Sequence, residues 1–186
     1  NGKELKLNTV QEAIYNKLAY VTEDRKGNGL ILSKSIKMNT TLANMSGISN
    51  GKVIDTDKEY AVAEEYRKKL KTKCPTVEQN VGNLSGGNQQ KVLLAKWMFA
   101  EPDILILDEP TRGIDVGAKY EIYCIINDLV AAGKSVIMIS SELPEVLGMS
   151  DRIYIMNEGR FVGEVSGEEA TSELIMSRIV KSGKGE

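Results

Sequence analysis

Histidine does not occur anywhere in this 186-residue sequence. Imidazole is the side chain that most readily serves as a base, a pH switch or a metal ligand near neutral pH, so mechanisms that depend on it are excluded. Cysteine is scarce too. Cys74 and Cys124 stand apart without CxxC spacing, which indicates two reduced thiols in a cytosolic protein rather than a disulfide framework.

Long apolar runs and a surplus of charge of either sign are also missing. No apolar stretch approaches the length that a membrane-spanning helix needs. The 24 basic and 26 acidic side chains leave a net charge of −2, which argues against a protein whose main work is to coat nucleic acid or anionic membrane. The length is sufficient to bury one substantial core.

The second half of the chain alternates between apolar strands and helical patterns. The segments "ILILD" and "SVIMIS" are continuously apolar, which is typical of a parallel sheet covered on both faces. This alternation predicts an α/β fold with a mostly parallel sheet. The expected strands are 19–22, 103–108, 135–140, 152–157 and 160–165, and the expected helices between and after them are 116–131, 142–148 and 168–179.

A helical segment interrupts this pattern between residues 35 and 100. Apolar residues recur at helical spacing in 35–45 and 55–73, with Asp55 or Thr56 as the N-cap of the second helix, and again in 85–100. We therefore expect an α/β core made of 1–34 and 101–180, a helical subdomain at 35–100, and a flexible tail at 181–186.

The stretch "LSGGNQQK", Leu84–Lys91, combines a serine and two glycines with the start of a predicted helix. Ser85, Gly86 and Gly87 would form an anion site there. The glycines let an oxygen approach the backbone amides, the helix dipole favours negative charge, and the serine hydroxyl donates a hydrogen bond. The alternative is a plain N-cap after a glycine turn. The following "NQQK" adds polar donors along the first helical turns.

Two carboxylates follow the buried strand in "ILILDEP", at the end of a strand where open α/β sheets place their ligands. Asp108 is positioned to hold a magnesium ion through water, and Glu109 to orient and polarise an attacking water molecule. The alternative is a strand end that is merely solvated.

In this order the two motifs and the following "TRGID" closely resemble the ATP-binding cassette (ABC) ATPases, a P-loop NTPase-like family. The resemblance makes Leu84–Gln89 the signature, Ile104–Asp108 the Walker B strand, Glu109 the catalytic carboxylate and Thr111–Asp115 the D-loop. It implies that nucleotide is contacted by Ser85, Gly86, Gly87, Asn88, Gln89, Glu23 and Asp115. Together with "EDRK" and "ISSELPEV", the motifs resemble the second cassette of bacterial carbohydrate (ribose, galactose or xylose-type) importers.

The sequence departs from the family pattern in two residues and in one missing motif. The glutamine of the Q-loop falls on Glu23 and the switch histidine falls on Ser141, which the resemblance makes a catalytic residue. No GxxxxGK[S/T] phosphate loop is found, because Gly51-Lys52 precedes Val53 and Gly133-Lys134-Ser135 leads from a helix into a strand. We therefore expect a fragment that lacks its Walker A region and is inactive alone. The alternative is a protein that binds no nucleotide and has borrowed the fold.

The resemblance also implies the cofactors and partners. ATP and Mg²⁺ would be the cofactors, a second cassette would associate head to tail, and a membrane permease would meet the helical subdomain on the cytoplasmic face of the cell membrane. Two other functions stay open. A cassette ATPase that acts on nucleic acid or the ribosome would show coiled-coil insertions or basic patches, and neither is visible, so no nucleic-acid partner is expected. A non-catalytic or regulatory module would only complete a partner's ATP site.

Overall fold

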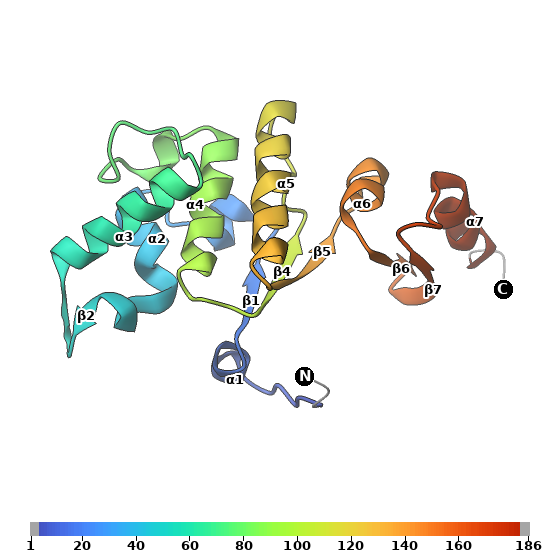
Figure 1. The fold of residues 1–186 in the computed structure, drawn as a ribbon, viewed down its shortest axis with the longest axis horizontal. Coiled ribbons are helices and arrows are strands. Elements are labelled where there is room, and N and C mark those ends of the chain that lie inside the picture. Colours follow the sequence, from blue (N-terminus) through green and yellow to red (C-terminus); the bar gives the residue numbers. More distant parts are fainter. Residues whose placement is uncertain (1–3, 183–186) are drawn as a thin grey trace. The chain divides into compact units, whose positions relative to one another are not determined.

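The computed structural model describes residues 4–182, and the chain divides between Ile139 and Ser140 into two compact units. The first unit contains a three-stranded sheet of β1 (Leu18–Val21), β4 (Ile104–Asp108) and β5 (Ser135–Ile139) (Figure 1). Both strand pairs are parallel, in the order β1-β4-β5. The predicted α/β fold with a parallel sheet is thereby confirmed.

Two helices that lie side by side cover this sheet in Figure 1. Helix α4 (Gly86–Met98) contacts β1, α5 (Val116–Ala131) contacts β5, and the two helices contact each other. Burial of apolar side chains from both sides drives this packing. The buried side chains include Val92, Leu93, Leu105, Leu107 and Ile122.

The segment between β1 and α4 is mainly helical, as predicted. It contains a π-type turn, Arg25–Gly29, then α2 (Ile36–Thr41), which is followed by 3₁₀ turns within Leu42–Ile48 that are broken by a kink at Asn44, and α3 (Thr56–Lys69). A two-stranded hairpin, β2 (Ser49–Asn50) with β3 (Val53–Ile54), separates α2 from α3. These helices pack on each other and on α4, so they share one compact unit with the sheet.

Helix boundaries differ from the prediction where a backbone conformation or a cap decides them. Asp55 caps α3 through a bond from the Lys58 N–H to its Oδ1 (3.0 Å), as one of the two expected residues. The helix ends at Lys69 rather than at residue 73, because Lys71 is left-handed with φ 51°. A short helix, α1 (Val10–Tyr15), was not predicted, although a capping box between Thr9 and Glu12 starts it.

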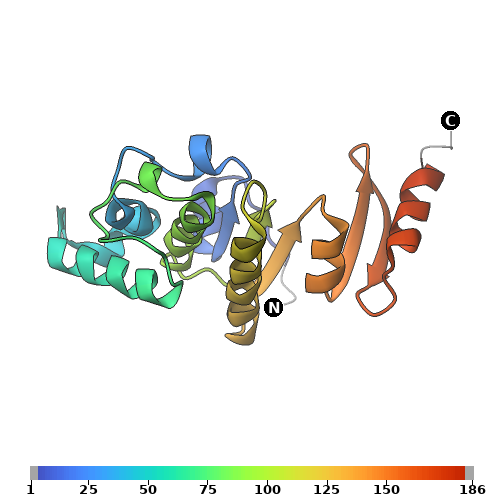
Figure 2. The ribbon, with the colours of Figure 1, turned by 90° about the horizontal axis from the view of Figure 1, so that it is seen from above.

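The second unit comprises α6 (Leu143–Met149), the antiparallel hairpin β6 (Arg152–Asn157) and β7 (Arg160–Ser166), and α7 (Ser172–Ser182). Helix α7 packs on both strands (orange and red in Figure 2). It begins four residues later than predicted, because the Thr171 hydroxyl accepts a bond from the Leu174 N–H (3.1 Å) and caps it there.

The core of the second unit is apolar and small. It is formed by Ile153, Ile155, Val165 and Ile175. Of the tail expected at 181–186, residues 181–182 end α7 and 183–186 lie outside the described residues. None of the helices in residues 4–182 is both long and apolar enough to cross a bilayer.

Candidate functional site

The signature turn places Ser85 directly before α4, as its N-cap residue. The Ser85 side chain accepts no capping bond from the first turn of the helix. Its Oγ instead accepts a bond from the Asn88 Nδ2 (3.0 Å), which leaves the hydroxyl hydrogen to donate elsewhere. The backbone N–H groups of the first helical turn point out of the N-terminus of α4, so this end of the helix offers donors to an anion.

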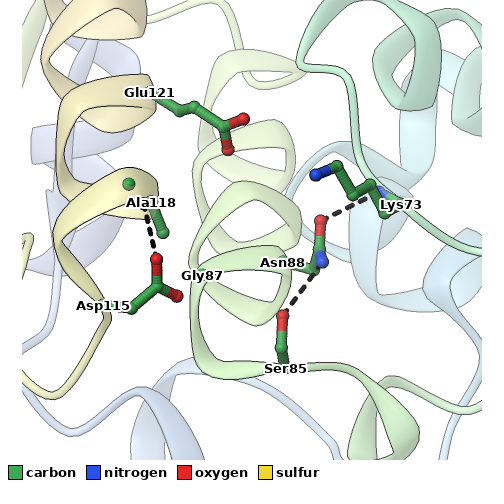
Figure 3. A pocket seen from close by; sticks show the side chains of 8 residues that line it. Lys73, Ser85, Gly87, Asn88, Asp115, Ala118 and Glu121 are labelled. Carbon is green, nitrogen blue, oxygen red and sulfur yellow. Dashed lines mark hydrogen bonds between the residues drawn. The ribbon is translucent and has the colours of Figure 1, made fainter.

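A cavity of about 260 Å³ opens beside this turn, between the starts of α4 and α5 (Figure 3). Its polar lining is held in place by short bonds. Asn88 Oδ1 accepts from the Lys73 backbone N–H (2.8 Å), and Asp115 Oδ1 caps α5 by accepting from the Ala118 N–H (2.9 Å). The lining residues are Lys73, Ser85, Gly87, Asn88, Asp115, Gly117, Ala118 and Glu121. The structure thus brings the signature and the end of the D-loop together.

The two signature glycines are required by close approach. A Cβ atom on Gly87 would lie 2.5 Å from the Cβ of Ala118, and one on Gly86 would lie 3.1 Å from the backbone oxygen of Gly113. Any larger residue at Gly87 would therefore push α4 away from α5. The glycines let the helix start lie directly against the loop after β4.

Asp108 and Glu109 stand at the carboxyl end of β4, as predicted. The Tyr20 hydroxyl donates a bond to Asp108 Oδ2 (2.6 Å), and this bond raises the pKa of Tyr20. Sequence reasoning did not find Tyr20. A usable signal exists, because Tyr20 pairs with Ile106, and alternation places both on the same face of the sheet as Asp108.

The backbone of Glu109 is in the left-handed region, with φ 46°. Its N–H donates a bond to the Ile139 backbone oxygen (2.9 Å), which fixes the residue at the carboxyl end of the central strand β4. Non-glycine residues in this region cost roughly 1–3 kcal/mol and concentrate at functional sites. The geometry therefore marks Glu109 as a residue that is held in a specific position.

We expected "NQQK" to add polar donors along the first helical turns, and the last three of these residues make their bonds inside the protein. Gln89, Gln90 and Lys91 are buried, with exposed fractions of 4%, 3% and 1%. Gln89 Nε2 donates to the backbone oxygen of Leu84 (3.2 Å), and thus holds the turn from within. Polar side chains are found at such depth when their bonds are satisfied internally, and these are.

Lys91, in the middle of the signature helix α4, contacts two other segments. Its Nζ lies 2.8 Å from Glu121 Oε2 on α5 and donates to the backbone oxygen of Lys71 (3.0 Å). The bond from Lys91 lowers the pKa of the Glu121 carboxyl. Lys91 therefore joins α4, α5 and the loop after α3.

The remaining predicted site residues lie in two other places. Glu23, in the loop after β1, forms an ion pair with Arg112 in the D-loop. Ser141 belongs to the second compact unit, between β5 and α6. Its neighbour Ser140 donates a bond to Glu145.

Comparisons with known proteins agree on one family. The ABC transporter family matches residues 1–112. The L-arabinose transport ATP-binding protein AraG of Geobacillus stearothermophilus is 61% identical over 182 residues, covering 98% of this chain and 36% of that protein. The ribose import ATP-binding protein RbsA of Clostridium tetani is 52% identical over 181 residues, covering 97% and 36%.

Solved structures show the same fold. The ATP-binding cassette MJ1267 superposes with a TM-score of 0.75 at 20% identity, over 94% of this chain and 71% of that chain. The cassette MJ0796, solved as a dimer with ADP and Pi, superposes with a TM-score of 0.71 at 21% identity, over 86% and 68%.

The xylose import ATP-binding protein XylG of Geobacillus kaustophilus is 55% identical over 177 residues, covering 95% of this chain and 35% of that protein. The chain thus spans about a third of the length of these curated relatives. The family match nevertheless covers 112 of its 186 residues, more than half. The expected signature, Walker B and D-loop segments occupy the expected places on α4, on β4 and before α5. The chain therefore belongs to the ABC transporter family of ATP-binding cassettes.

Proposed function

We propose that this chain is part of an ATP-hydrolysing subunit that energises carbohydrate import across the bacterial cell membrane. The observation that carries the proposal is the cavity in which the signature turn meets Asp115 of the D-loop. The relatives named above are an L-arabinose transport, a ribose import and a xylose import ATP-binding protein.

The signature side of the chain would complete a nucleotide site in a second cassette. In this role Ser85 donates its hydroxyl hydrogen, and Gly86 and Gly87 donate their backbone amides, to the terminal phosphate held by the partner's phosphate loop. Asn88 orients Ser85, Asp115 flanks the same cavity, and Gln89 supports the turn from inside. The head-to-tail arrangement of the two cassettes is part of this proposal; the solved cassette MJ0796, which has the same fold, is dimeric.

The carboxylate side suits magnesium. Mg²⁺ binds proteins through one or two carboxylates and takes its other ligands from water and substrate phosphates. Residues 4–182 contain no cluster of three acidic or cysteine side chains, which would form a full protein cage, but they offer Asp108 at the strand end. A magnesium ion held there would neutralise phosphate charge. Asp108 would orient the water ligands and Glu109 the attacking water.

The membrane side is assigned to the helical segment at 35–100, with the Glu23 loop beside it. These helices would meet the permease subunit on the cytoplasmic face of the membrane. Closing two half-sites on one charged nucleotide favours the closed state, and this difference in binding energy can drive a membrane partner. Glu23 and Ser141 would occupy the positions of the Q-loop glutamine and the switch histidine. Neither is the usual residue, and an ionised Glu23 only accepts hydrogen bonds.

A second candidate function is a non-catalytic or regulatory cassette segment that only completes a partner's ATP site. The observation that favours it is that Glu23 and Ser141 stand at the positions of the Q-loop glutamine and the switch histidine, and neither is the usual residue. In this case Asp108 and Glu109 would take no part in hydrolysis.

Transport is the test of the main proposal. We expect the subunit that carries these residues, assembled with its permease in vesicles, to drive ATP-dependent uptake of a labelled pentose such as arabinose, xylose or ribose. Vesicles without ATP are the control. Equal uptake with and without ATP for every sugar tested would contradict the proposal.

Nucleotide binding by the 186-residue chain alone tests whether its own residues can hold the phosphates of ATP. Titration calorimetry with Mg-ATP is expected to give no saturable heat, because the strong phosphate contacts of a phosphate loop are missing. The matched control is the chain with Asp108→Asn and Glu109→Gln. Saturable binding by the native chain that this control loses would show that residues here replace the phosphate loop.

A further inference from the structure

Arg25, in the turn after β1, donates to three acceptors on two other motifs. Its Nε donates to Gln89 Oε1 (3.3 Å), and its Nη1 donates to Gln90 Oε1 (3.4 Å) and to the backbone oxygen of Arg112 (3.4 Å). Gln89 and Gln90 belong to the signature helix, and Arg112 belongs to the D-loop. One guanidinium thus connects three segments that are far apart in the sequence.

The acceptors lead directly to the signature turn. Gln89, held by Arg25 through its oxygen, donates through its Nε2 to the backbone oxygens of Leu84 (3.2 Å) and Val81 (3.4 Å). The amide orientation of Gln89 is therefore fixed from both ends. Because Leu84 immediately precedes Ser85, a change at Arg25 is transmitted through one side chain to the start of the turn.

The Arg25 guanidinium is closely packed as well as hydrogen-bonded. A Cβ atom on Gly86 would lie 3.2 Å from Arg25 Nη2, so the guanidinium is packed directly behind the first signature glycine. Burial lowers the pKa of Arg25, yet an arginine keeps its charge at neutral pH. The ion pair between Glu23 and Arg112 adds a second connection between the same turn and the D-loop.

Arginine is the one side chain that suits these contacts. Its planar fork presents fixed donors in several directions at once, whereas a lysine ammonium is a single compact donor. A lysine at this position keeps the charge but cannot reach Gln89, Gln90 and the Arg112 oxygen with the same geometry. Substitution by lysine is therefore informative.

We propose that Arg25 is a positioning residue that holds the turn after β1, the signature turn and the D-loop in one arrangement. The inference rests on the proposed function, because it gives that arrangement a purpose: Ser85, Gly86 and Gly87 are presented preorganised to the nucleotide of a partner cassette. Arg25 itself does not touch the nucleotide. Its loss therefore reduces the rate of the step that needs the closed pair more than it reduces nucleotide binding by the partner's phosphate loop.

Amide hydrogen exchange on the 186-residue chain tests the positioning role without nucleotide. Arg25→Ala is expected to speed exchange at least tenfold together in 23–29, 85–91 and 111–115, because all three segments lose a common anchor. Arg67→Ala is the matched control, since Arg67 pairs only locally with Glu64 (2.9 Å). Unchanged exchange in 85–91 would overturn the proposal, as would equal effects of the two variants.

A lysine variant covers the case in which Arg25→Ala unfolds. Arg25→Lys is expected to give the same pattern with a smaller amplitude. Faster exchange in both variants that extends to the β6–β7 hairpin would instead show a general structural role and overturn the proposal.

Kinetics of the assembled transporter provide the second test. Arg25→Ala is expected to lower kcat for ATP hydrolysis at least tenfold with KM changed less than twofold, and Arg25→Lys to restore part of the loss. A fall that appears in KM alone would make Arg25 a nucleotide contact and overturn the positioning role. Absence of ATP hydrolysis by the unmodified transporter would refute the proposed function instead, and the exchange experiment would still decide the role of Arg25.

Discussion

Replacing Glu109 with glutamine is expected to lower ATP hydrolysis by the assembled transporter about 10²–10⁴-fold, the range that a general base contributes. Glutamine has nearly the same shape but cannot accept a proton from the attacking water. Asp108 is unchanged in this variant, so nucleotide and magnesium binding should persist. The expected result is a transporter that binds ATP and remains closed on it.

The backbone conformation of Glu109 allows the role of its side chain in hydrolysis to be tested apart from its effect on stability. Its φ of 46° is costly for any residue other than glycine, and this cost is retained only where the surroundings enforce it. Glu109→Gly is therefore expected to lose hydrolysis as completely as Glu109→Gln, while the midpoint of thermal unfolding does not fall. Hydrolysis would then be lost while thermal stability is kept or raised, as at other strained functional residues.

The matched control is Glu101→Gln. Glu101 has the same side chain and a similar left-handed backbone, φ 51°, but it follows α4 instead of β4. Phosphate release should stay within twofold of the unmodified protein in this variant. Hydrolysis by Glu109→Gln within tenfold of the unmodified rate would contradict the role assigned to Glu109, and the non-catalytic alternative would then be preferred.

Sequence patterns predicted the sheet well because its strands are short, apolar and bounded by clear breaks. Strands β1, β4 and β5 lie within one residue of their expected ranges at both ends, and helix α5 matches 116–131. Strands β6 and β7 were also expected, but they form a separate antiparallel hairpin outside this sheet. The errors arose where a single residue decides: the left-handed Lys71 that ends α3, and the Thr171 cap that starts α7. Such local choices are weakly encoded in hydrophobic periodicity.

The candidate motifs were recognised from the sequence by their specific order, and the roles assigned to their residues stay predictions. Their supporting contacts were not predicted. The contacts of Arg25, Gln89 and Lys91 were not found, because polar residues on a helix are normally expected to face water. Their burial depends on tertiary partners, Glu121 and Arg112 among them, which no periodicity within α4 reveals.

Replacing Lys91 with alanine is expected to lower the free energy of unfolding by about 2–4 kcal/mol. The side chain of Lys91 is only 2% exposed, so its removal leaves a cavity and deprives the Lys71 oxygen of its donor. The side chain of Glu121 is 43% exposed, and water can solvate its charge once Lys91 is gone. The loss of stability therefore arises mainly from the cavity and from the Lys71 oxygen that has lost its donor. It is smaller than the loss on breaking a fully buried ion pair.

Urea denaturation of the 186-residue chain measures this effect, with Lys134→Ala as the matched control. Lys134 also pairs with a carboxylate, Asp103, at 3.0 Å, but its side chain is only partly buried (31% exposed) and that of Asp103 is exposed (70%). Such a surface pair contributes about 0–1 kcal/mol, so the control should change the midpoint little. Equal midpoints for the two variants would show that burial of Lys91 contributes nothing.

The pH dependence of the difference identifies the part that belongs to the ion pair. The pKa of Glu121 is lowered in the folded state, chiefly by the bond from Lys91, below its ordinary value of 4.5. A lowered carboxyl pKa stabilises the fold above that ordinary value, and the stabilisation disappears as the pH falls through the folded pKa. The gap between the unmodified chain and Lys91→Ala should therefore narrow below about pH 4.5. A gap that stays constant from neutral pH into this acidic range would mean that packing of the lysine stem, and not its charge, joins α4 to α5.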